Sequence, residues 1–402
     1  MSSKPRFVGK KVKLGDVCDV LNGFAFKSRQ YVDKGIRIIR IANVQKGYLE
    51  DSKPCFYPVK LTDSLKQYIL EENDLLVSLT GNVGRVALLE KSFLPAALNQ
   101  RVACLRIKDE SRICKRYLYH ALNSSLFENN CVESANGIAQ KNMSTTWLKG
   151  YRIPAPSMVE QEIIIKQLDL IQRQISNVKR QLSEFDSLVK SRFVEMFGDA
   201  QVGYKFELQS LGSMLSTEPQ NGLYKPQRFY VERGGTPIVR VDAFQKGCIE
   251  NYSALKRLTC TSAELKTYEL VNNDIVINRV NGSIDRVGKI AWIRGLQEPT
   301  VFESNMMRFH IDEKRMSLAF VTTYLNSGDI RQQIKACARI ANQCSINQTN
   351  VANFEIPVPP LSLQQEFADF VAQVDKSRFI AQQQIEKLQM LYDSLAQDYF
   401  GD

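Results

Sequence analysis

Few residues in this sequence have the types and spacings that enzymes use for chemistry. The two histidines stand alone, His120 in an apolar helical stretch and His310 in a strand-like one, so both are expected to be packing residues rather than general bases. Residues 311–314 (IDEK) hold two adjacent acidic side chains, whereas a nuclease site needs spaced carboxylates that converge on a metal ion. Cys337 and Cys344 are seven residues apart with no histidine nearby, which indicates unreactive thiols.

The sequence also contains no phosphate-binding GxxxxGK[ST] loop, no GxGxxG turn and no HExxH zinc motif. The amino-methyltransferase tetrapeptide of Asp or Asn, two prolines and an aromatic residue is missing too. We therefore expect a protein that binds rather than catalyses, with no metal site and no cofactor of its own.

The cysteines and the hydropathy indicate a location. Nine cysteines occur without a CxxC pair, which excludes most zinc sites and disulfide frameworks and indicates reduced thiols in a cytoplasm. No stretch approaches ~20 unbroken apolar residues, and the basic N-terminus lacks the apolar core of a signal peptide. A cytoplasmic protein without a membrane partner is expected.

The net charge of +10 is unevenly distributed. Residues 1–150 hold 24 Lys and Arg against 14 Asp and Glu, and residues 201–355 hold 19 against 15. Residues 151–200 are neutral and residues 356–402 carry −4. The two large segments are thus the candidates for binding a polyanion, since a basic surface attracts phosphates.

These two basic segments are related copies. GIRIIRIANVQKGYLED (35–51) matches GTPIVRVDAFQKGCIEN (235–251) at an offset of 200 residues. IPAP (153–156) matches IPVP (356–359) at an offset of 203, and loop insertions explain the small drift. The chain is therefore an internal duplication, with two repeats too few and too large for a solenoid.

Each copy mixes strands and helices. In the first copy, β-branched and aliphatic runs bounded by Gly, Asn and Pro predict strands over Ile36–Ile41, Asp74–Leu79, Arg85–Glu90 and Arg101–Ile107. Residues 115–123 (KRYLYHALN) predict a helix, and the prolines of IPAP predict an extended segment before the next helix.

A long helix follows each copy. The apolar residues step by four and three, which is the seam of a coiled coil. The seam residues are Ile164, Leu168, Ile171, Ile175, Val178, Leu182, Phe185, Val189 and Met196 in the first helix, and Phe367, Val371, Val374, Ala381, Ile385, Leu388, Tyr392, Leu395 and Tyr399 in the second. Arg192 and Arg378 also fall on the seam, where they are expected to extend to solvent or, alternatively, to contact a partner subunit.

The order of copies and helices predicts an α+β fold. Two mixed α/β domains in a pseudo-two-fold arrangement are separated by two long coiled-coil-like helices, and these must be antiparallel if their seams pair. The expected boundaries are 1–155 for the first domain, 156–200 for the central helix, 201–358 for the second domain and 359–402 for the C-terminal helix.

This plan resembles the specificity subunit of a type I restriction–modification system over nearly the whole chain. The resemblance depends on the duplicated order, on Glu160–Gln161 and Gln364–Glu366 after the two IPxP motifs, and on helices that both end in Phe-Gly-Asp. It also depends on NDLLVSLTGNVGRV (73–86) and NDIVINRVNGSIDRVG (273–288).

The resemblance implies that each domain recognises one half of a bipartite double-stranded DNA site. The helices would set the unread gap and dock two modification subunits, which carry S-adenosylmethionine and methylate adenine N6. Restriction and translocation subunits would join the assembled complex. This chain would then supply sequence recognition and no catalysis.

Base reading requires Arg, Lys, Asn and Gln on loops that reach base edges, and four sets of such loop residues recur in both copies. The first set is Asn22 and Lys27 with Asn221 and Lys225; the second is Arg40, Gln45 and Lys46 with Arg240, Gln245 and Lys246. The third is Thr80, Asn82 and Arg85 with Arg279, Asn281, Ser283 and Arg286; the fourth is Gln140, Lys141 and Asn142 with Arg339, Asn342, Gln343 and Asn347.

The comparison between copies separates two roles. Residues repeated in both copies, such as Gln45 and Gln245, suggest structure or phosphate contact, because the two half-sites should differ. Residues that differ, such as Thr80 against Val280 or Leu79 against Arg279, are better candidates for base reading.

An alternative of another class is an autonomous two-headed DNA-binding or DNA-bridging regulatory protein. Genes for an adenine methyltransferase and a helicase-nuclease beside this one would favour the specificity subunit. A self-contained methyltransferase or nuclease lacks its motifs in this sequence.

Overall fold

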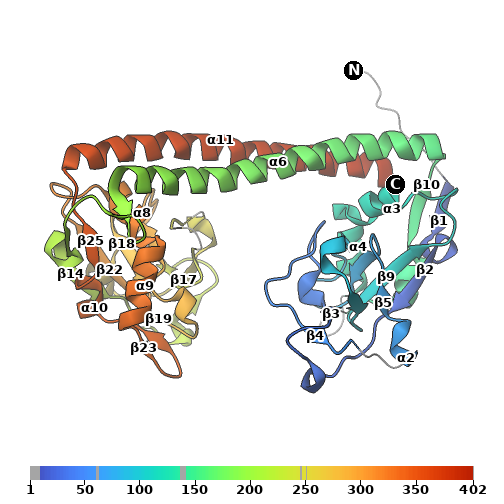
Figure 1. Ribbon diagram of the computed structural model, residues 1–402, viewed down its shortest axis with the longest axis horizontal. Coiled ribbons are helices and arrows are strands. Elements are labelled where there is room, and N and C mark those ends of the chain that lie inside the picture. The colour runs from blue at the N-terminus through green and yellow to red at the C-terminus, as the bar shows by residue number, and fades with distance from the viewer. Residues whose placement is uncertain (1–9, 60–62, 136–141, 245–246, 250, 402) are drawn as a thin grey trace. The chain divides into compact units, whose positions relative to one another are not determined.

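The computed structural model describes residues 10–59, 63–135, 142–244, 247–249 and 251–401. The chain forms two compact units: Met1–Arg180 with Ala381–Asp402 make unit 1, and Gln181–Ile380 make unit 2. Two 40-residue helices, α6 (Met158–Phe197) and α11 (Leu361–Phe400), belong in part to each unit (Figure 1). The sequence suggested four consecutive segments, whereas packing groups part of each long helix with one globular part.

The strands of unit 1 form two four-stranded sheets and one two-stranded sheet. The first is ordered β2 (Cys18–Asn22), β9 (Val102–Ile107), β6 (Leu75–Ser78) and β7 (Val86–Leu88), all antiparallel. The second is ordered β4 (Phe56–Tyr57), β3 (Ile36–Ile39), β8 (Ala96–Leu98) and β5 (Ile69–Leu70), with β3 parallel to β8. In the third, β1 (Lys10–Lys13) pairs with β10 (Arg152–Ala155).

Short helices complete unit 1. They are α1 (Leu14–Val17), α2 (Asp63–Lys66), α3 (Lys115–Leu122), α4 (Ser125–Ser134) and α5 (Thr145–Gly150). The four strands and the helix predicted from the sequence are confirmed as β3, β6, β7, β9 and α3, with ends that differ by one or two residues. The extended segment predicted at IPAP is confirmed as β10.

The described strands of unit 2 also form two four-stranded sheets. One is ordered β14 (Leu215–Asn221), β22 (Met306–Ile311), β18 (Ile275–Asn278) and β20 (Ile290–Trp292). The other is ordered β15 (Tyr230–Val231), β17 (Lys256–Leu258), β16 (Thr236–Val239) and β21 (Val301–Phe302), with β16 parallel to β21. The first order matches that of unit 1. In the second sheet β17, β16 and β21 are ordered as β4, β3 and β8 are, but the fourth strand differs, because β15 pairs with β17 whereas β5 pairs with β8. The shared strands confirm the duplication at the level of structure.

Unit 2 also contains smaller sheets and four short α-helices among its described residues. A three-stranded sheet is ordered β19 (Val280–Asn281), β24 (Cys344–Ser345) and β23 (Arg339–Ile340), and two-stranded sheets join β11 (Gly198–Asp199) to β12 (Gly203–Tyr204) and β13 (Leu208–Ser210) to β25 (Glu355–Pro357). The helices are α7 (Ser262–Tyr268), α8 (Leu318–Leu325), α9 (Gly328–Cys337) and α10 (Gln348–Ala352).

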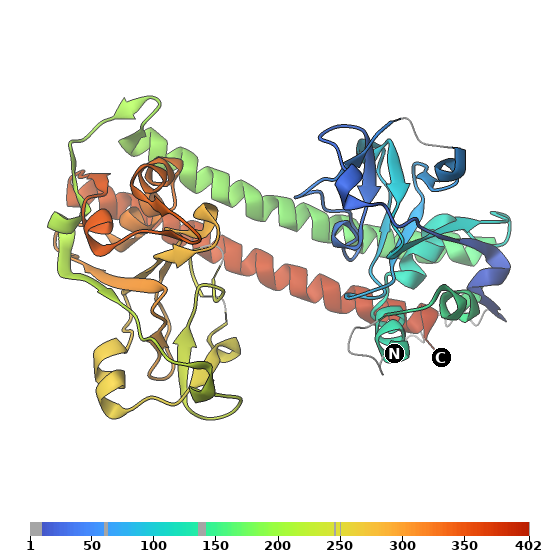
Figure 2. The same ribbon diagram turned by 90° about the horizontal axis from the view of Figure 1, so that it is seen from below.

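Within each unit the segments of α6 and α11 are antiparallel neighbours (Figures 1 and 2). In unit 1 the Gln172 amide nitrogen is 3.4 Å from the Tyr392 hydroxyl group, and Gln167, five residues earlier, contacts Tyr399, seven residues later. In unit 2 Asp186 pairs with Arg378, and Arg192 with Glu366. Residues of higher number on α6 therefore contact residues of lower number on α11, as expected for antiparallel helices.

The burial of the seam residues follows the packing within each unit. Those less than 9% exposed are Ile164, Leu168, Ile171, Ile175, Val178, Phe367, Val374, Ala381, Tyr392 and Tyr399. Those partly exposed are Leu182, Phe185, Val189, Met196, Val371, Ile385, Leu388 and Leu395. The fully buried seam positions also contact the globular cores, so the seam packs against more than the other helix.

The two seam arginines link the helices in unit 2. The Arg192 guanidinium group lies 2.8 Å from a carboxylate oxygen of Glu366, and that of Arg378 lies 2.7 Å from a carboxylate oxygen of Asp186. The sequence led us to expect both side chains to extend to solvent or to a partner subunit. Instead each finds an acidic partner on the other helix, because the antiparallel register places one opposite.

A glutamine attaches the start of each long helix to its globular part. The Gln161 side chain accepts a hydrogen bond from the Cys114 N–H (2.8 Å) and donates to the carbonyl oxygens of Arg112 (3.0 Å) and Pro156 (2.9 Å). Gln364 makes the equivalent contacts with Ser317, Arg315 and Pro359. Both glutamines are fully buried, so their amides satisfy backbone groups that would otherwise be costly to bury.

None of the helices in the described ranges combines the length and the apolar character needed to cross a membrane.

Candidate nucleic-acid interface

The third and fourth loop sets meet in both units. In unit 1 the backbone N–H of Met143 donates to the carbonyl oxygen of Leu79 (2.8 Å), and Thr80 forms a β-bridge with Asn142. In unit 2 the backbone N–H of Ile346 donates to the carbonyl oxygen of Arg279 (2.9 Å). The loop after the central strand, β6 or β18, is therefore joined to the segment before α5 or α10.

In unit 2 this junction includes a β-hairpin. β24 pairs with β19 on one side and with β23 on the other, and the turn between β23 and β24 contains Asn342 and Gln343. Arg339, Asn342 and Gln343 are exposed. Asn347 has a different role, because its side chain caps α10 by accepting a hydrogen bond from the Asn350 N–H (2.8 Å).

The loop of the third set is held in place in unit 2 by α9. Arg331 donates to the carbonyl oxygens of Ile284 (2.7 Å) and Val287 (2.6 Å), so the loop between these residues is fixed on the helix. Arg286 is exposed between those two anchors. The Arg279 guanidinium group donates to the Ser304 carbonyl oxygen (3.1 Å), so part of its hydrogen-bonding capacity is used within the protein.

The second and third sets meet in unit 1 through Gln45, whose side-chain oxygen accepts a hydrogen bond from Arg85. The ammonium group of Lys46 lies 2.8 Å from the Glu128 carboxylate on α4. The Arg40 guanidinium group donates to the Lys53 carbonyl oxygen (2.7 Å). These partners are exposed or half-buried, so a phosphate group could replace them at small cost.

Arg240, the unit 2 counterpart of Arg40, lies between two acidic side chains. The Arg240 Nε atom lies 3.7 Å from Asp242 and 3.6 Å from Glu303, and its guanidinium group lies over the Tyr230 ring. Four predicted contact residues fall outside the described ranges, namely Gln140, Lys141, Gln245 and Lys246.

The first loop set contains three exposed residues and one lysine that is paired with an acidic side chain. Asn22, Lys27 and Asn221 are exposed. Lys225, in contrast, lies 2.6 Å from a carboxylate oxygen of Glu264 and 4.7 Å from the centre of the Phe229 ring, and its side chain is only 9% exposed. Its positive charge is therefore neutralised inside unit 2 rather than presented at the surface.

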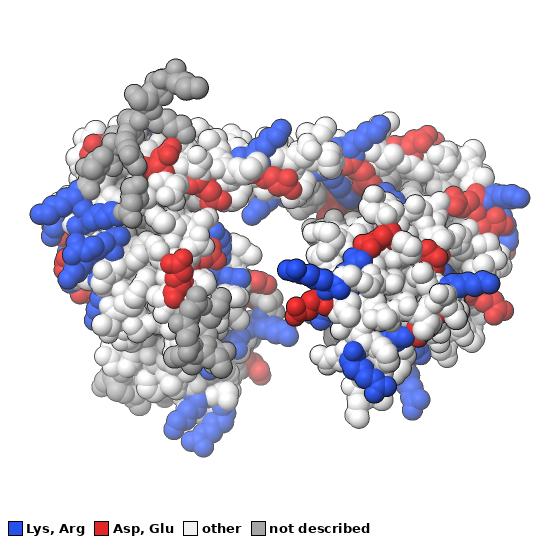
Figure 3. Space-filling model, turned by 180° about the vertical axis from the view of Figure 1, so that it is seen from behind, with Lys and Arg blue, Asp and Glu red and all other residues white. Residues whose placement is uncertain are grey.

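Both units also expose basic residues that the repeat comparison missed. Lys and Arg side chains project from the end of each globular part that is remote from its helices (Figure 3). Exposed arginines outside the four sets include Arg29, Arg101, Arg228 and Arg233. Arg29 and Arg228 occupy matching positions, 199 residues apart as Asn22 and Asn221 are, so the repeat comparison overlooked them although the charge count of each segment pointed to such residues.

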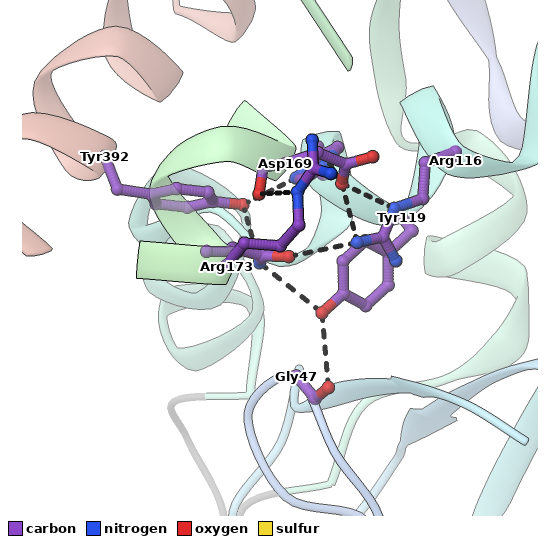
Figure 4. Close-up of polar contacts among 8 residues, drawn as sticks. Gly47, Arg116, Tyr119, Asp169, Arg173 and Tyr392 are labelled. Carbon is purple, nitrogen blue, oxygen red and sulfur yellow. Dashed lines mark hydrogen bonds and ion pairs between the residues drawn. The ribbon is translucent and has the colours of Figure 1, made fainter. Parts of the chain in front are cut away.

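A buried polar network connects the second loop set of unit 1 with α3, α6 and α11 (Figure 4). The Tyr119 hydroxyl group donates to the Gly47 carbonyl oxygen (3.2 Å). The Gln172 amide nitrogen lies 3.4 Å from the hydroxyl oxygens of both Tyr119 and Tyr392. The loop that carries Gln45 and Lys46 is thus linked to both long helices.

His120 and Asp169 form the centre of this network. His120 Nε2 lies 2.8 Å from the Asp169 carboxylate, and His120 Nδ1 lies 3.0 Å from the Tyr392 hydroxyl group. An ionised carboxylate can only accept hydrogen bonds, so Nε2 carries the imidazole proton and Nδ1 accepts from Tyr392. Arg116 donates to the same carboxylate (2.7 Å) and stacks over the Tyr119 ring.

The surroundings shift the pKa values of this pair. Burial lowers the pKa of His120, because the interior disfavours the imidazolium ion. Burial alone would raise the pKa of Asp169, but hydrogen bonds from His120 and Arg116 outweigh it and hold that pKa at about 2. The sequence predicted a packing role for His120; the structure adds two hydrogen bonds that join three separate segments.

Unit 2 has no copy of this network among its described residues. Thr322 and Thr323 occupy the α8 positions that Tyr119 and His120 occupy on α3, and their hydroxyl groups donate to Leu318 (2.7 Å) and Ala319 (2.7 Å) within the helix. His310, also predicted to be a packing residue, instead contacts the buried Asp274 carboxylate through Nδ1 (2.7 Å). The duplicated scaffold thus holds different polar connections in its two copies.

Comparison with known proteins agrees with this duplicated plan. The profile of the type I restriction modification DNA specificity domain matches residues 9–184 and again 206–390. The chain belongs to this family. The resemblance inferred from the sequence is thereby confirmed.

Named relatives cover almost the whole chain. The StySPI type I restriction enzyme specificity subunit of Salmonella potsdam is 25% identical over an alignment of 399 residues that covers 95% of this chain and 85% of the relative. The EcoKI specificity subunit of Escherichia coli is 24% identical over an alignment of 378 residues that covers 89% of this chain and 80% of the relative.

Solved structures show the same fold. The S subunit of a type I restriction–modification system from M. genitalium superposes with a TM-score of 0.50 at 16% identity, covering 100% of this chain and 98% of that one. A chain from a study of complex assembly and conformational transition of the type I R-M system gives a TM-score of 0.52 at 15% identity, covering 98% of both chains. The α+β class predicted from the sequence is confirmed.

Proposed function

We propose that this chain is the cytoplasmic specificity subunit of a type I restriction–modification enzyme and that it recognises a bipartite double-stranded DNA sequence. Residues 1–155 would read one half-site and residues 201–358 the other. The observation that carries the proposal is the junction of the third and fourth loop sets, which is built in the same way in both units from residues that differ between them. A shared scaffold with different exposed side chains suits two readers of different sequences.

The helical segments 156–200 and 359–402 have a separate role in this proposal. They would set the number of unread base pairs and dock two modification subunits. On α11, Met390 and Leu391 in unit 1 and Phe379 and Ile380 in unit 2 are 46–65% exposed. We take these two pairs of adjacent exposed apolar residues as candidates for the partner surface, because exposed apolar patches often mark such surfaces.

The chemistry would lie in those partners. The modification subunits would bind S-adenosylmethionine and transfer its methyl group to adenine N6, and restriction and translocation subunits would complete the enzyme. In this arrangement the chain determines which DNA sequence is recognised and how the subunits are positioned.

Exchanging one recognition segment tests the reading role. Residues 14–155 would be replaced by the same region of another member of the family, and genomic N6-methyladenine would be mapped in cells that contain the modification subunits. We expect one half of the methylated motif to change while the other half and the gap stay the same. A change in both halves, or in neither, would contradict the assignment of one half-site to each segment.

The docking role is tested by the double variant Met390→Asp, Leu391→Asp. We expect loss of co-purification with the modification subunit while the variant itself stays folded. Val271→Asp is the matched control, because Val271 is also exposed but lies off the helices. Unchanged co-purification of the double variant would place the docking surface elsewhere.

A further inference from the structure

The β23–β24 hairpin of unit 2 exposes an isoleucine among polar residues. Ile340 is 69% exposed, whereas its cross-strand partner Cys344 is 6% exposed. Directly paired residues of antiparallel strands lie on the same face, so Cys344 covers the core and Ile340 lies beyond its edge. A single exposed aliphatic residue is ordinary on a protein surface, so the meaning of this one depends on its neighbours.

Those neighbours are the residue types that contact DNA. Arg339, Asn342 and Gln343 are exposed on the same hairpin, which lies at the end of unit 2 away from its helical segments (Figure 1). Among the described residues, neither Arg339 nor Arg286 of the adjoining loop forms an ion pair with an acidic side chain. Unpaired arginines beside an apolar tip complement a polyanion better than an apolar protein surface.

The hairpin is also held firmly at its base. β24 pairs with β19 through Cys344 and Asn281. Two residues after Cys344, the backbone N–H of Ile346 donates to the carbonyl oxygen of Arg279 (2.9 Å). The turn residues 341–343 therefore extend from a three-stranded sheet rather than from a free loop. A two-stranded ribbon has the width that the major groove of B-DNA admits.

We propose that this hairpin enters the major groove of the half-site read by unit 2, and that Ile340 contacts the C5-methyl group of a thymine. The inference rests on the proposed function and adds a specificity-determining residue to it. The thymine methyl is the apolar group that base pairs present in the major groove, and hydrogen-bonding side chains such as Arg339 or Gln343 cannot detect it. The exposed aliphatic side chain of Ile340, next to the turn of a polar hairpin, can contact this methyl group.

Removing the methyl group from the DNA tests the contact directly. The probes are duplexes that carry the motif found by methylation mapping, with each thymine of the unit 2 half-site replaced in turn by deoxyuridine. For the full-length wild-type chain we expect one replacement to weaken binding about fourfold, the effect of exposing one buried methyl group. Ile340→Ala should weaken binding to the thymine duplex by a similar factor and bind the two duplexes equally.

The control and the outcomes separate this inference from the proposed function. Val271→Ala, an equally conservative change at an exposed position outside the hairpin, should keep the wild-type preference for thymine. Wild-type binding that is insensitive to every deoxyuridine, or Ile340→Ala binding that keeps the preference, would overturn the methyl contact while the two-reader function stands. Absence of sequence-specific binding by the wild-type chain would instead overturn the proposed function.

Discussion

The carbonyl oxygen of Arg279 accepts a hydrogen bond from the backbone N–H of Ile346, 2.9 Å away. The two residues are 67 positions apart in the chain, and Leu79 and Met143 repeat the contact at 2.8 Å in unit 1. Because backbone atoms make it, the contact survives while the side chains around it vary. Each unit thus has one constant junction that presents variable polar side chains.

Arg286 tests whether those side chains read bases. Arg286→Ala removes an exposed guanidinium group from a loop that Arg331 holds in place, so the loop itself should keep its position. We expect binding to the cognate duplex to weaken by about 1–3 kcal/mol, with relaxed specificity in the unit 2 half-site only. Competition binding with duplexes altered in one half-site at a time measures both effects.

Two controls accompany this variant. Lys314→Ala removes an exposed charge from the turn after β22 and should leave specificity unchanged. Arg85→Ala should relax specificity in the other half-site. Equal loss at both half-sites in the Arg286→Ala variant would show that the arginine only contributes general phosphate affinity.

The variant Tyr119→Phe tests whether the buried network positions the loop of unit 1 that carries Gln45 and Lys46. Tyr119→Phe removes the hydrogen bond to Gly47 (3.2 Å) and the contact with Gln172 (3.4 Å). We expect the free energy of unfolding to fall by about 1 kcal/mol, and binding to weaken for the unit 1 half-site alone.

Tyr117→Phe is the matched control for that experiment. It also removes one hydroxyl group of α3, whose hydrogen bond goes to Pro154 (3.0 Å) rather than to the loop. A similar loss of stability without an effect on either half-site is expected. If both variants weaken DNA binding equally, stability rather than loop position explains the effect.

His120 should make the stability of unit 1 depend on pH. Its pKa is lower in the folded state, because burial disfavours the charged ring, so the unfolded chain binds more protons below its unfolded pKa of about 6.5. The free energy of unfolding should therefore fall as the pH drops below about 6.5, by at most about 1.4 kcal/mol per pH unit. Asp169, with a pKa of about 2, adds a further loss only between about pH 4 and pH 2.

This prediction can be measured by urea unfolding between pH 7 and pH 5. In a Trp292→Phe background the fluorescence of Trp147 reports on unit 1, since the chain has two tryptophans. His120→Gln removes the titrating group and should flatten the pH dependence in this range. The same slope in both proteins would mean that His120 does not control it.

The sequence predicted the parts of the fold that depend on contiguous patterns. β3, β6, β7 and β9 are aliphatic runs bounded by Gly or Asn, so local composition identified them. The Arg192–Glu366 ion pair needed the antiparallel register of two distant helices. It could not be read from either helix alone.

The ends of the long helices show a second limit of prediction from the sequence. Phe193 and Phe197 fall outside the chosen seam, yet both pack against Phe320 of α8. Phe193 stacks on that ring at a ring-centre distance of 5.2 Å, and Phe197 meets it edge to face at 4.7 Å. A seam search assumes one partner for the helix, whereas this end of α6 also packs on a globular core. Both helices end in Phe-Gly-Asp, and that repeated aromatic residue was the available signal.

The candidate site was predictable only as a set of loops. Their Asn, Gln, Lys and Arg content and their repetition pointed to segments that partly come together in the fold, but pairing inside the protein was not visible. Glu264, which neutralises Lys225, lies 39 positions further along the chain. The β23–β24 hairpin was missed because RIANQCS has neither alternating hydrophobicity nor a glycine turn.

Shortening both helices tests their proposed role in setting the gap. Deleting residues 178–184 and 380–386 removes one heptad from each, which keeps the seam in phase and shortens each helix by about 10 Å. We expect the unread gap to shrink by about three base pairs while both half-sites keep their sequences. Methylation mapping reads the new motif, and altered half-site bases with an unchanged gap would contradict the role.

In the proposed function this chain alone determines a split recognition sequence. The most direct measurement is genome-wide sequencing of N6-methyladenine in cells that contain the modification subunits, with and without this gene. We expect a methylated motif of two short sequences separated by a fixed unread gap, present only with the gene. A continuous motif, or the same methylation in cells without the gene, would contradict it.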